Sequence, residues 1–180
     1  MNEFFDVLNE RGEYLNKVES RAECHKNGLW HRAVVLFIIS EDNSKVLLQK
    51  RSATKKLWPN LWDVTAAGHV LAGELGYQTV IRETKEEIGV EVNKEDLEYI
   101  GSTISETNQN GINNKHFNEY FVYHKNINID DIVLQEEEVS DIKWITKEEL
   151  YAKIDNNYDG LTTKIGCWNH LKKYFEIINK

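Results

Sequence analysis

The chain has 180 residues, of which 41% are hydrophobic, enough to build one well-buried core. We therefore expect a single domain over residues 1–180. Its 22 basic and 30 acidic residues give a net charge of −8, which argues against binding to long nucleic acid. The longest apolar run, residues 33–39, is far shorter than a membrane span, and the first residues lack a signal-peptide pattern. We expect a cytoplasmic protein without membrane contact, and Cys24 and Cys167 are too few for a disulfide framework.

The first half of the chain reads mainly as strands. Residues 4–8 and 13–18 flank a turn and predict an N-terminal β-hairpin. Residues 33–40 form a continuous apolar run typical of a buried strand, and a second strand is expected at 45–49. The loop at 50–61 is basic, and residues 63–67 lead into a glycine-punctuated loop at 68–73.

The second half alternates helices and strands. A helix is predicted over about 74–88, with Gly89 as its C-terminal cap. Strands are expected at 97–105 and 116–124, separated by an Asn- and Gly-rich mobile loop at 107–115. Thr146 and Glu149 have the capping-box spacing that begins a short helix, and an amphipathic helix is expected over 163–178. This alternation predicts a mixed α/β domain with helices on both faces of a sheet.

Three glutamates share one face of the predicted helix at 74–88. Glu83, Glu86 and Glu87 are three and four residues apart, a spacing that brings helical side chains together. Exposed like charges at this spacing repel by about a few tenths of a kcal/mol per pair. The cluster suits a divalent cation with oxygen ligands, Mg²⁺ or Mn²⁺, and the alternative is a solvated acidic face.

The surrounding residues favour the metal site. Gly68, Glu74, Arg82-Glu83, Glu86-Glu87 and Gly89 form an ordered pattern that arises by chance on the order of once per million such chains. The pattern resembles the Nudix box, G-x5-E-x7-R-E-U-x-E-E-x-G-U, and runs without gaps from Gly68 to Val90. Thr84 stands where the box usually has an aliphatic residue, a mild departure.

The resemblance implies an α/β/α sandwich with a mixed sheet, here with the N-terminal β-hairpin as an extension. It implies that Glu83, Glu86, Glu87 and the carbonyl of Gly68 hold Mg²⁺ or Mn²⁺. It also implies that Glu74 and Arg82 form a structural ion pair. The implied reaction is hydrolysis of a diphosphate linked to another moiety, with Glu87, Glu83 or Glu119 as the general base.

A second resemblance reaches beyond the box, over roughly residues 5 to 150. Segments 31–33, 48–52, 58–59 and 67–69, with His25, Lys55, Trp62 and Asp63, look like the Nudix branch related to isopentenyl-diphosphate isomerase. In the isomerases the positions of Arg51 and Lys55 bind the diphosphate, and histidines like His25, His31 and His69 belong to a second metal site. For Arg51 and Lys55, the alternative to diphosphate binding is a position in a solvated loop. For His25 or His69, the alternatives to metal binding are contact with the substrate or capping of the local backbone.

Two departures argue against isomerase chemistry. The isomerases carry a catalytic cysteine where this chain has Ala67, and a Glu-x-Glu pair of which only the second residue, Glu119, is kept here. Alkene isomerisation needs a proton donor and an acceptor on opposite faces of the substrate, and half of that equipment is missing. A hydrolase is favoured over an isomerase and over a diphosphate-binding module without activity.

Several residues receive no firm role from the sequence. His25 and His31 are six residues apart with no helix predicted between them, and His116, His124 and His170 show no pattern that assigns a function. Trp144 is expected in the core, whereas Trp58, Trp62 and Trp168 suit either packing or stacking on a ligand. We expect the acidic run 136–138 either to form a solvated turn or to place one of its glutamates at the metal site. The moiety attached to the diphosphate stays open, as does a homodimer through a strand edge or the hairpin.

Overall fold

The computed structural model describes residues 3–178, in which nine strands form one mixed sheet. The central strand is β3 (Trp30–Ile39), which pairs in parallel with β8 (Ile112–His124) along its whole length. On its other edge β3 pairs antiparallel with β6 (Ala66–His69) and with β4 (Lys45–Arg51). Beyond β4 lie β5 (Trp62–Asp63) and β9 (Val139–Thr146).

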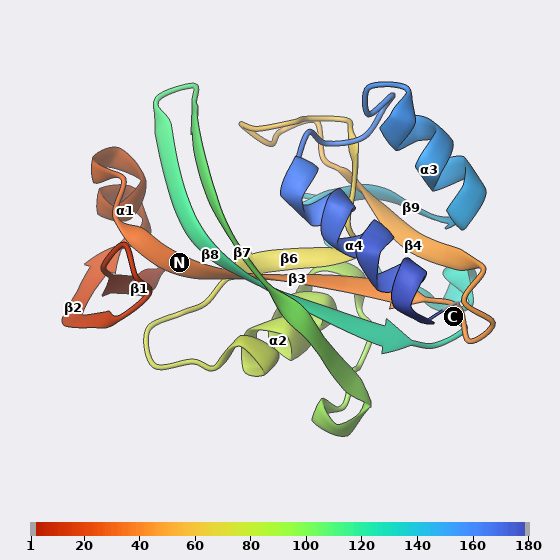
Figure 1. The fold of residues 1–180 in the computed structure, drawn as a ribbon, viewed down its shortest axis with the longest axis horizontal. Coiled ribbons are helices and arrows are strands. Elements are labelled where there is room, and N and C mark those ends of the chain that lie inside the picture. Colours follow the sequence, from red (N-terminus) through yellow and green to blue (C-terminus); the bar gives the residue numbers. More distant parts are fainter. Residues whose placement is uncertain (1–2, 179–180) are drawn as a thin grey trace.

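Helices cover both faces of this sheet, as predicted (Figure 1). Helix α2 (Gly76–Ile88) packs Val80 and Ile88 on one face, against a cluster that includes Val34, Leu36 and Phe121. Helices α3 (Lys147–Asp155) and α4 (Ile165–Ile178) cover the other face, where Trp168 is fully buried against Phe37. Because successive strand residues point to opposite faces, β3 supplies both clusters from one apolar run.

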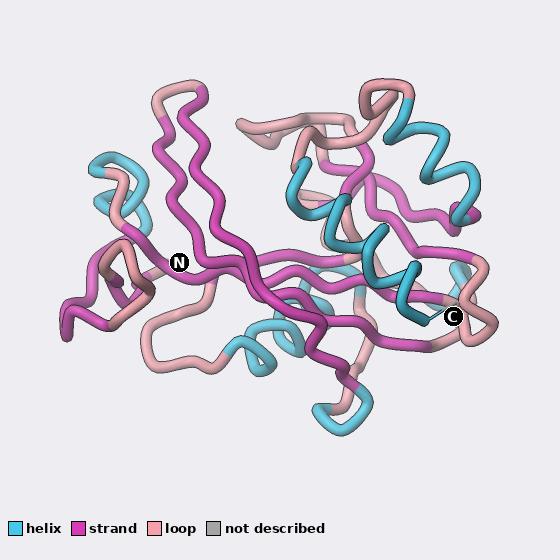
Figure 2. The backbone as a smooth tube through the Cα atoms, in the orientation of Figure 1, coloured by secondary structure: helices cyan, strands magenta, loops and turns pink. Residues whose placement is uncertain are grey.

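An N-terminal unit lies at one end of the sheet (Figures 1 and 2). The predicted hairpin is confirmed as β1 (Phe4–Leu8) and β2 (Tyr14–Ser20). It is followed by α1 (Arg21–Asn27), a short helix that the sequence analysis missed. Ser20 caps its first turn by accepting a hydrogen bond from the Glu23 amide, and Gly28 ends it in the left-handed conformation.

The expected loop at 107–115 was wrong. Strands β7 (Leu97–Gln109) and β8 continue through most of it and meet at a tight Asn110-Gly111 turn, where both residues have positive φ. The paired ladder therefore overrides the low strand propensity of the asparagines. The remaining elements are two short 3₁₀ helices, η1 (Lys94–Asp96) and η2 (Ile129–Asp131). Among residues 3–178, no helix has the length and apolar composition to cross a bilayer.

Candidate active site

The loop between β6 and α2 brings Gly68 against Glu83. A β-carbon at position 68 would stand 2.1 Å from the carboxyl of Glu83, so glycine at this position leaves room for the Glu83 side chain where it lies. Helix α2 ends as predicted at Gly89, whose φ of 70° is left-handed. Thr84, the departure from the box pattern, is buried, and its hydroxyl donates a hydrogen bond to the Val80 carbonyl at 2.7 Å.

Arg82 joins the loop to the helix. Its Nε and Nη2 donate to the two carboxylate oxygens of Glu74, each at 3.2 Å, which is the ion pair that the box pattern implies. Glu74 also accepts from the Thr79 hydroxyl at 2.8 Å. A further nitrogen, Arg82 Nη1, lies 2.7 Å from Glu83 and 3.3 Å from Glu86. One cationic group thus already draws two of the predicted metal ligands together.

Glu87 is buried beside these two carboxylates. Its Oε2 accepts from Gln49 Nε2 at 3.1 Å and from the Ala67 amide at 3.4 Å. Burial, with the nearby charge of Glu83, raises the pKa of Glu87 to about 8. Burial also raises the pKa of Glu83 to about 7, although Arg82 acts in the opposite direction. Crowded oxygen donors of this kind fit Mg²⁺ or Mn²⁺, because a divalent charge would offset both burial and mutual repulsion.

The predicted phosphate-binding residues lie along the same edge of the site. Arg51 follows Gln49 by two positions on β4, so its side chain leaves the same face of the sheet. Arg51 donates to Asp63 at 3.3 Å and to the Leu57 carbonyl at 3.0 Å. Lys55 forms an ion pair with Glu138. The charge of Glu138 contributes to the raised pKa of Glu87, so one member of the acidic run lies near the box.

Asp63, which the sequence analysis named only as part of the second resemblance and gave no role, is the centre of a buried ion-pair network. It is 0% exposed and binds Lys164 Nζ at 2.7 Å and Thr162 Oγ1 at 3.0 Å in addition to Arg51. Burial alone would raise the pKa of Asp63, but the charges of Lys164 and Arg51 outweigh it and hold that pKa below its usual value. Asp63 therefore ties the basic loop to the start of α4. Gln49, quoted only within segment 48–52, was likewise given no role, although its position two residues before Arg51 could have indicated one.

Glu119 lies at the other end of α2. It pairs with Arg32 at 3.3 Å, and a β-carbon on Gly76, the first residue of the helix, would stand 2.1 Å from Glu119 Oε2. Along an α-helix Gly76 precedes Glu83 by roughly 10 Å and Glu87 by roughly 16 Å. The carboxylate of Glu119 thus contacts the beginning of the helix, whereas the box glutamates lie in its middle and at its end.

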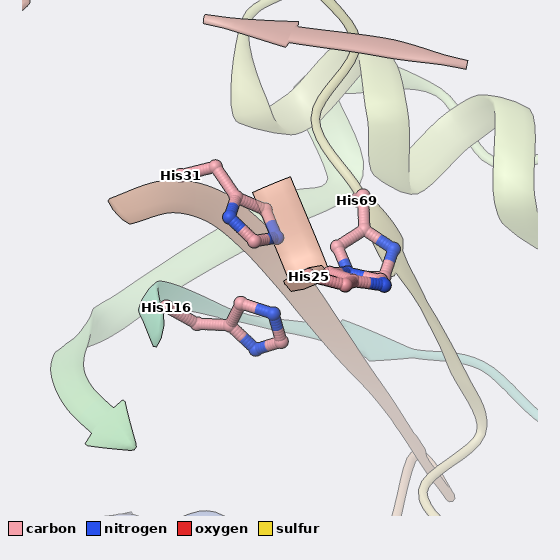
Figure 3. Close-up of side chains that lie close together, drawn as sticks. All are labelled: His25, His31, His69 and His116. Atoms are coloured by element: carbon pink, nitrogen blue, oxygen red, sulfur yellow. The ribbon is translucent and has the colours of Figure 1, made fainter. Parts of the chain in front are cut away.

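His69 lies on the opposite face of β6 from Gly68, because neighbouring strand residues alternate. There it joins His25 from α1, His31 from β3 and His116 from β8 (Figure 3). His116, to which the sequence analysis gave no function, is therefore part of this cluster. Burial lowers the pKa of His25 and of His31 to about 4 and shifts the pKa of His69 and of His116 well below the ordinary value.

The tryptophans divide between core and edge. Trp144 packs against the core as predicted and donates to the Ile127 carbonyl at 3.0 Å. Trp168 is fully buried and donates to the Thr162 carbonyl, which leaves no face for a ligand. Trp62 packs against the core beneath Lys143, whose Nζ lies 4.0 Å from the ring centroid. Trp58, in the basic loop, donates to the Thr163 hydroxyl at 3.0 Å.

Comparisons with known proteins agree with this architecture. The NUDIX domain model matches residues 29–164. Nudix hydrolase 3 of Arabidopsis thaliana is 38% identical over 183 aligned residues, covering 99% of this chain; the chain spans 23% of that protein's length. The uncharacterized Nudix hydrolase lmo0368 of Listeria monocytogenes is 37% identical, with 83% of each chain covered. DR0079 from Deinococcus radiodurans has a similar fold, with a TM-score of 0.70, 21% identity and coverage of 91% and 94%.

The sandwich and the box thus define a known class of protein. The chain belongs to the Nudix family. It is a hydrolase of that family, whose members act on pyrophosphate-containing compounds.

Proposed function

We propose that this chain hydrolyses a phosphoanhydride bond in a small diphosphate compound, with Mg²⁺ or Mn²⁺ as its cofactor. One observation carries the proposal: Glu83 and Glu86 both contact Arg82 Nη1, beside the buried Glu87 and the close approach of Gly68. A set of convergent carboxylates next to a basic loop is the equipment that hydrolysis of an anionic anhydride requires.

The metal would be held by Glu83, Glu86, Glu87 and the carbonyl of Gly68. When bound, it supplies neutralisation of phosphate oxygens and a lowered pKa for a coordinated water. The protein contributes the orientation of these ligands. Gln49 and the Ala67 amide hold one oxygen of Glu87, and Arg82 holds Glu83 and Glu86 from the side. Glu74 and Arg82 then act as positioning residues that fix the loop to the helix.

Arg51 and Lys55 would bind the diphosphate. The Arg51 guanidinium has a fixed direction because Asp63 and the Leu57 carbonyl hold it, and a planar fork of donors suits phosphate oxygens. Lys55 is paired with Glu138, so an incoming phosphate would compete with that carboxylate for the ammonium. Each cation has an indirect link to the box, because Arg51 follows Gln49 on β4 and the charge of Glu138 acts on the pKa of Glu87.

For the general base we infer Glu83 among the three candidates. Glu87 has one oxygen fixed by two donors, which suits a metal ligand. Glu119 is committed to Arg32 at the opposite end of α2 and acts there as a positioning residue. Arg82 holds Oε1 of Glu83 at 2.7 Å, so Oε2 of Glu83 is the oxygen that would take the proton from the attacking water.

The substrate class that we propose is nucleoside diphosphate derivatives. A Caenorhabditis elegans Ap4A hydrolase, 25% identical with a TM-score of 0.55, covers 81% of this chain. Isomerase chemistry is the weaker alternative, because position 67 is alanine and both thiols lie elsewhere. Cys24 belongs to the cluster beneath the N-terminal hairpin, and Cys167 to the core under α4. Burial raises the pKa of Cys24 to about 11, so it is no proton donor or acceptor of catalytic strength.

The experiment is a release assay for phosphate and nucleotide over a library of diphosphate compounds, with Mg²⁺ or Mn²⁺ present. Wild type is compared with Glu86→Gln, and Glu91→Gln is the control because Glu91 is exposed and pairs with Lys85 outside the site. We expect metal-dependent turnover that falls at least about 100-fold in Glu86→Gln, about 2.7 kcal/mol in transition-state stabilisation. Conversion of isopentenyl diphosphate, or ligand-induced stabilisation without turnover of any compound, would contradict the proposal.

A further inference from the structure

The N-terminal unit, from β1 to α1, ends before the segment that the NUDIX domain model matches, which begins at residue 29. Besides pairing with β2, its strand β1 contacts residues 70–75, the loop that leads from β6 to α2 and that we call the box loop (Figure 1). A part of the chain outside the matched domain therefore contacts the loop that contains Glu74.

Strand β1 binds two successive amides of the box loop. The Ala72 amide donates to the Phe4 carbonyl at 2.8 Å, and the Gly73 amide donates to Asp6 Oδ2, also at 2.8 Å. Leu71, the residue before them, packs against the hydrophobic cluster beneath the hairpin. Because a carboxylate is a stronger acceptor than a neutral carbonyl, Asp6 makes the firmer of the two hydrogen bonds. The backbone of the loop thus depends on the hairpin for its hydrogen bonds.

Arg32, from β3, holds the next residue of the same loop. Its Nη2 donates to the carbonyl of Glu74 at 2.6 Å, and its Nη1 donates to Glu119 Oε1 at 3.3 Å. The guanidinium carbon lies 5.5 Å from the ring centroid of Tyr14, in β2. A guanidinium is a rigid, planar fork of donors, so a carboxylate and an aromatic ring together fix the direction of the bond to Glu74.

Glu74 connects the box loop to the predicted metal ligands. Its carboxylate binds Arg82, whose Nη1 lies 2.7 Å from Glu83 and 3.3 Å from Glu86. The side chains of Glu74 and Arg82 are 25% and 23% exposed, and an ion pair that water reaches holds its partners only weakly. The hydrogen bonds to residues 72–74 therefore add the rigidity that this pair lacks.

We propose that the N-terminal hairpin positions the box loop for metal binding, with Asp6 and Arg32 as the positioning residues. Both side chains act on the backbone of the loop and reach the glutamates through Glu74 and Arg82. A loop that is already ordered loses less conformational freedom when the ion binds, which increases the affinity for the ion. This inference rests on the metal site of the proposed function and gives that site a support outside the box.

The test measures binding of Mn²⁺ alone to the full-length protein, without substrate, from the electron paramagnetic resonance signal of the free ion. The Mn²⁺ bound by the box is the part that is lost in Glu86→Gln. We expect Asp6→Ala and Arg32→Met to weaken binding of this Mn²⁺ at least about tenfold. Asp6→Asn keeps a side-chain oxygen that can accept from the Gly73 amide, and it should restore most of the affinity.

Glu13→Ala is the matched control, because Glu13 lies on the same hairpin and accepts a hydrogen bond from Asn9 within the hairpin turn. This variant should bind Mn²⁺ as the wild type does. The melting temperature of each metal-free protein, measured in parallel, separates a loss of metal affinity from a general loss of stability. If Asp6→Ala does not fold, Arg32→Met and Asp6→Asn still carry the test.

The outcomes distinguish this inference from the proposed function. Mn²⁺ affinity equal to that of the wild type in folded Asp6→Ala and Arg32→Met would overturn the inference and leave the proposed function intact. An equal loss of affinity in Glu13→Ala, or in Asp6→Asn as in Asp6→Ala, would also overturn it, because the effect would not follow the contact with Gly73. A wild type that binds no Mn²⁺ sensitive to Glu86→Gln would contradict the proposed metal site, and the inference with it.

Discussion

Gly68 and Glu83 share a contact that no other residue at position 68 could make, since a β-carbon there would stand 2.1 Å from the Glu83 carboxyl. Glu83 is a flexible side chain and would move away, so we expect Gly68→Ala to fold. The movement would displace a metal ligand, and turnover should fall at least about tenfold, 1.4 kcal/mol in transition-state stabilisation.

Gly166→Ala is the matched control, because a β-carbon there meets nothing closer than Thr103 Oγ1 at 3.8 Å. Steady-state kinetics and denaturant unfolding of both variants separate loss of activity from loss of stability. Full activity in Gly68→Ala would mean that the position of Glu83 does not matter to catalysis.

Gln49 gives a second test in which stability and activity should move in different directions. Its Nε2 donates to Glu87, but its Oε1 is buried without a partner within the described chain. Gln49→Leu removes that unsatisfied oxygen, so the free energy of unfolding should stay level or rise. It also frees Glu87 to rotate, and kcat should fall about tenfold.

Urea unfolding and kcat, measured on the same preparation of Gln49→Leu, test whether Gln49 holds Glu87 for catalysis. A destabilised variant with unchanged kcat would show that Gln49 serves the core and not the site.

Local patterns accounted for much of what the sequence predicted. The box helix and its Gly89 cap depend on residues close together in the chain, so spacing alone could indicate them, whereas the Glu74–Arg82 pair was indicated by the resemblance to the Nudix box. The Thr146 capping box was predictable for the same reason. The roles of these residues in catalysis still rest on the proposed function.

Interactions between segments far apart in the chain could not be predicted from the sequence. Asp63 meets Lys164 about a hundred positions further on, and no local pattern links them. His116 joins the histidine cluster only because β8 lies parallel to β3, which sets it opposite His31. Helix α1 escaped prediction because seven residues give too weak a periodicity to read.

Lys55 should act on substrate binding. If it contacts the diphosphate, Lys55→Ala should raise KM about tenfold and leave the melting temperature nearly unchanged, because its partner Glu138 is partly exposed. Lys56→Ala is the control, since the neighbouring Lys56 is an exposed lysine of the same loop.

Initial-rate kinetics against the substrate found in the release assay provide the measurement. Equal KM values in the two lysine variants would assign Lys55 to a salt bridge alone.

The ion pairs of the buried Asp63 lead us to predict how the free energy of unfolding depends on pH. Burial works to raise its pKa, and Lys164 and Arg51 more than offset that effect, so the folded-state pKa lies below the unfolded value of about 3.8. A carboxyl with a depressed pKa stabilises the fold above the unfolded value and loses this contribution as pH falls through the folded value. Asp63→Asn leaves both cations without their anion and should lower the free energy of unfolding by about 3–5 kcal/mol at pH 7. The difference between wild type and variant should shrink below pH 3.8, because the carboxyl of the unfolded chain takes up its proton there while that of the folded chain stays ionised to lower pH. Urea titrations at pH 7 and pH 3 measure that difference, and a gap of equal size at both values would mean that the Asp63 charge does not hold Arg51 and Lys164.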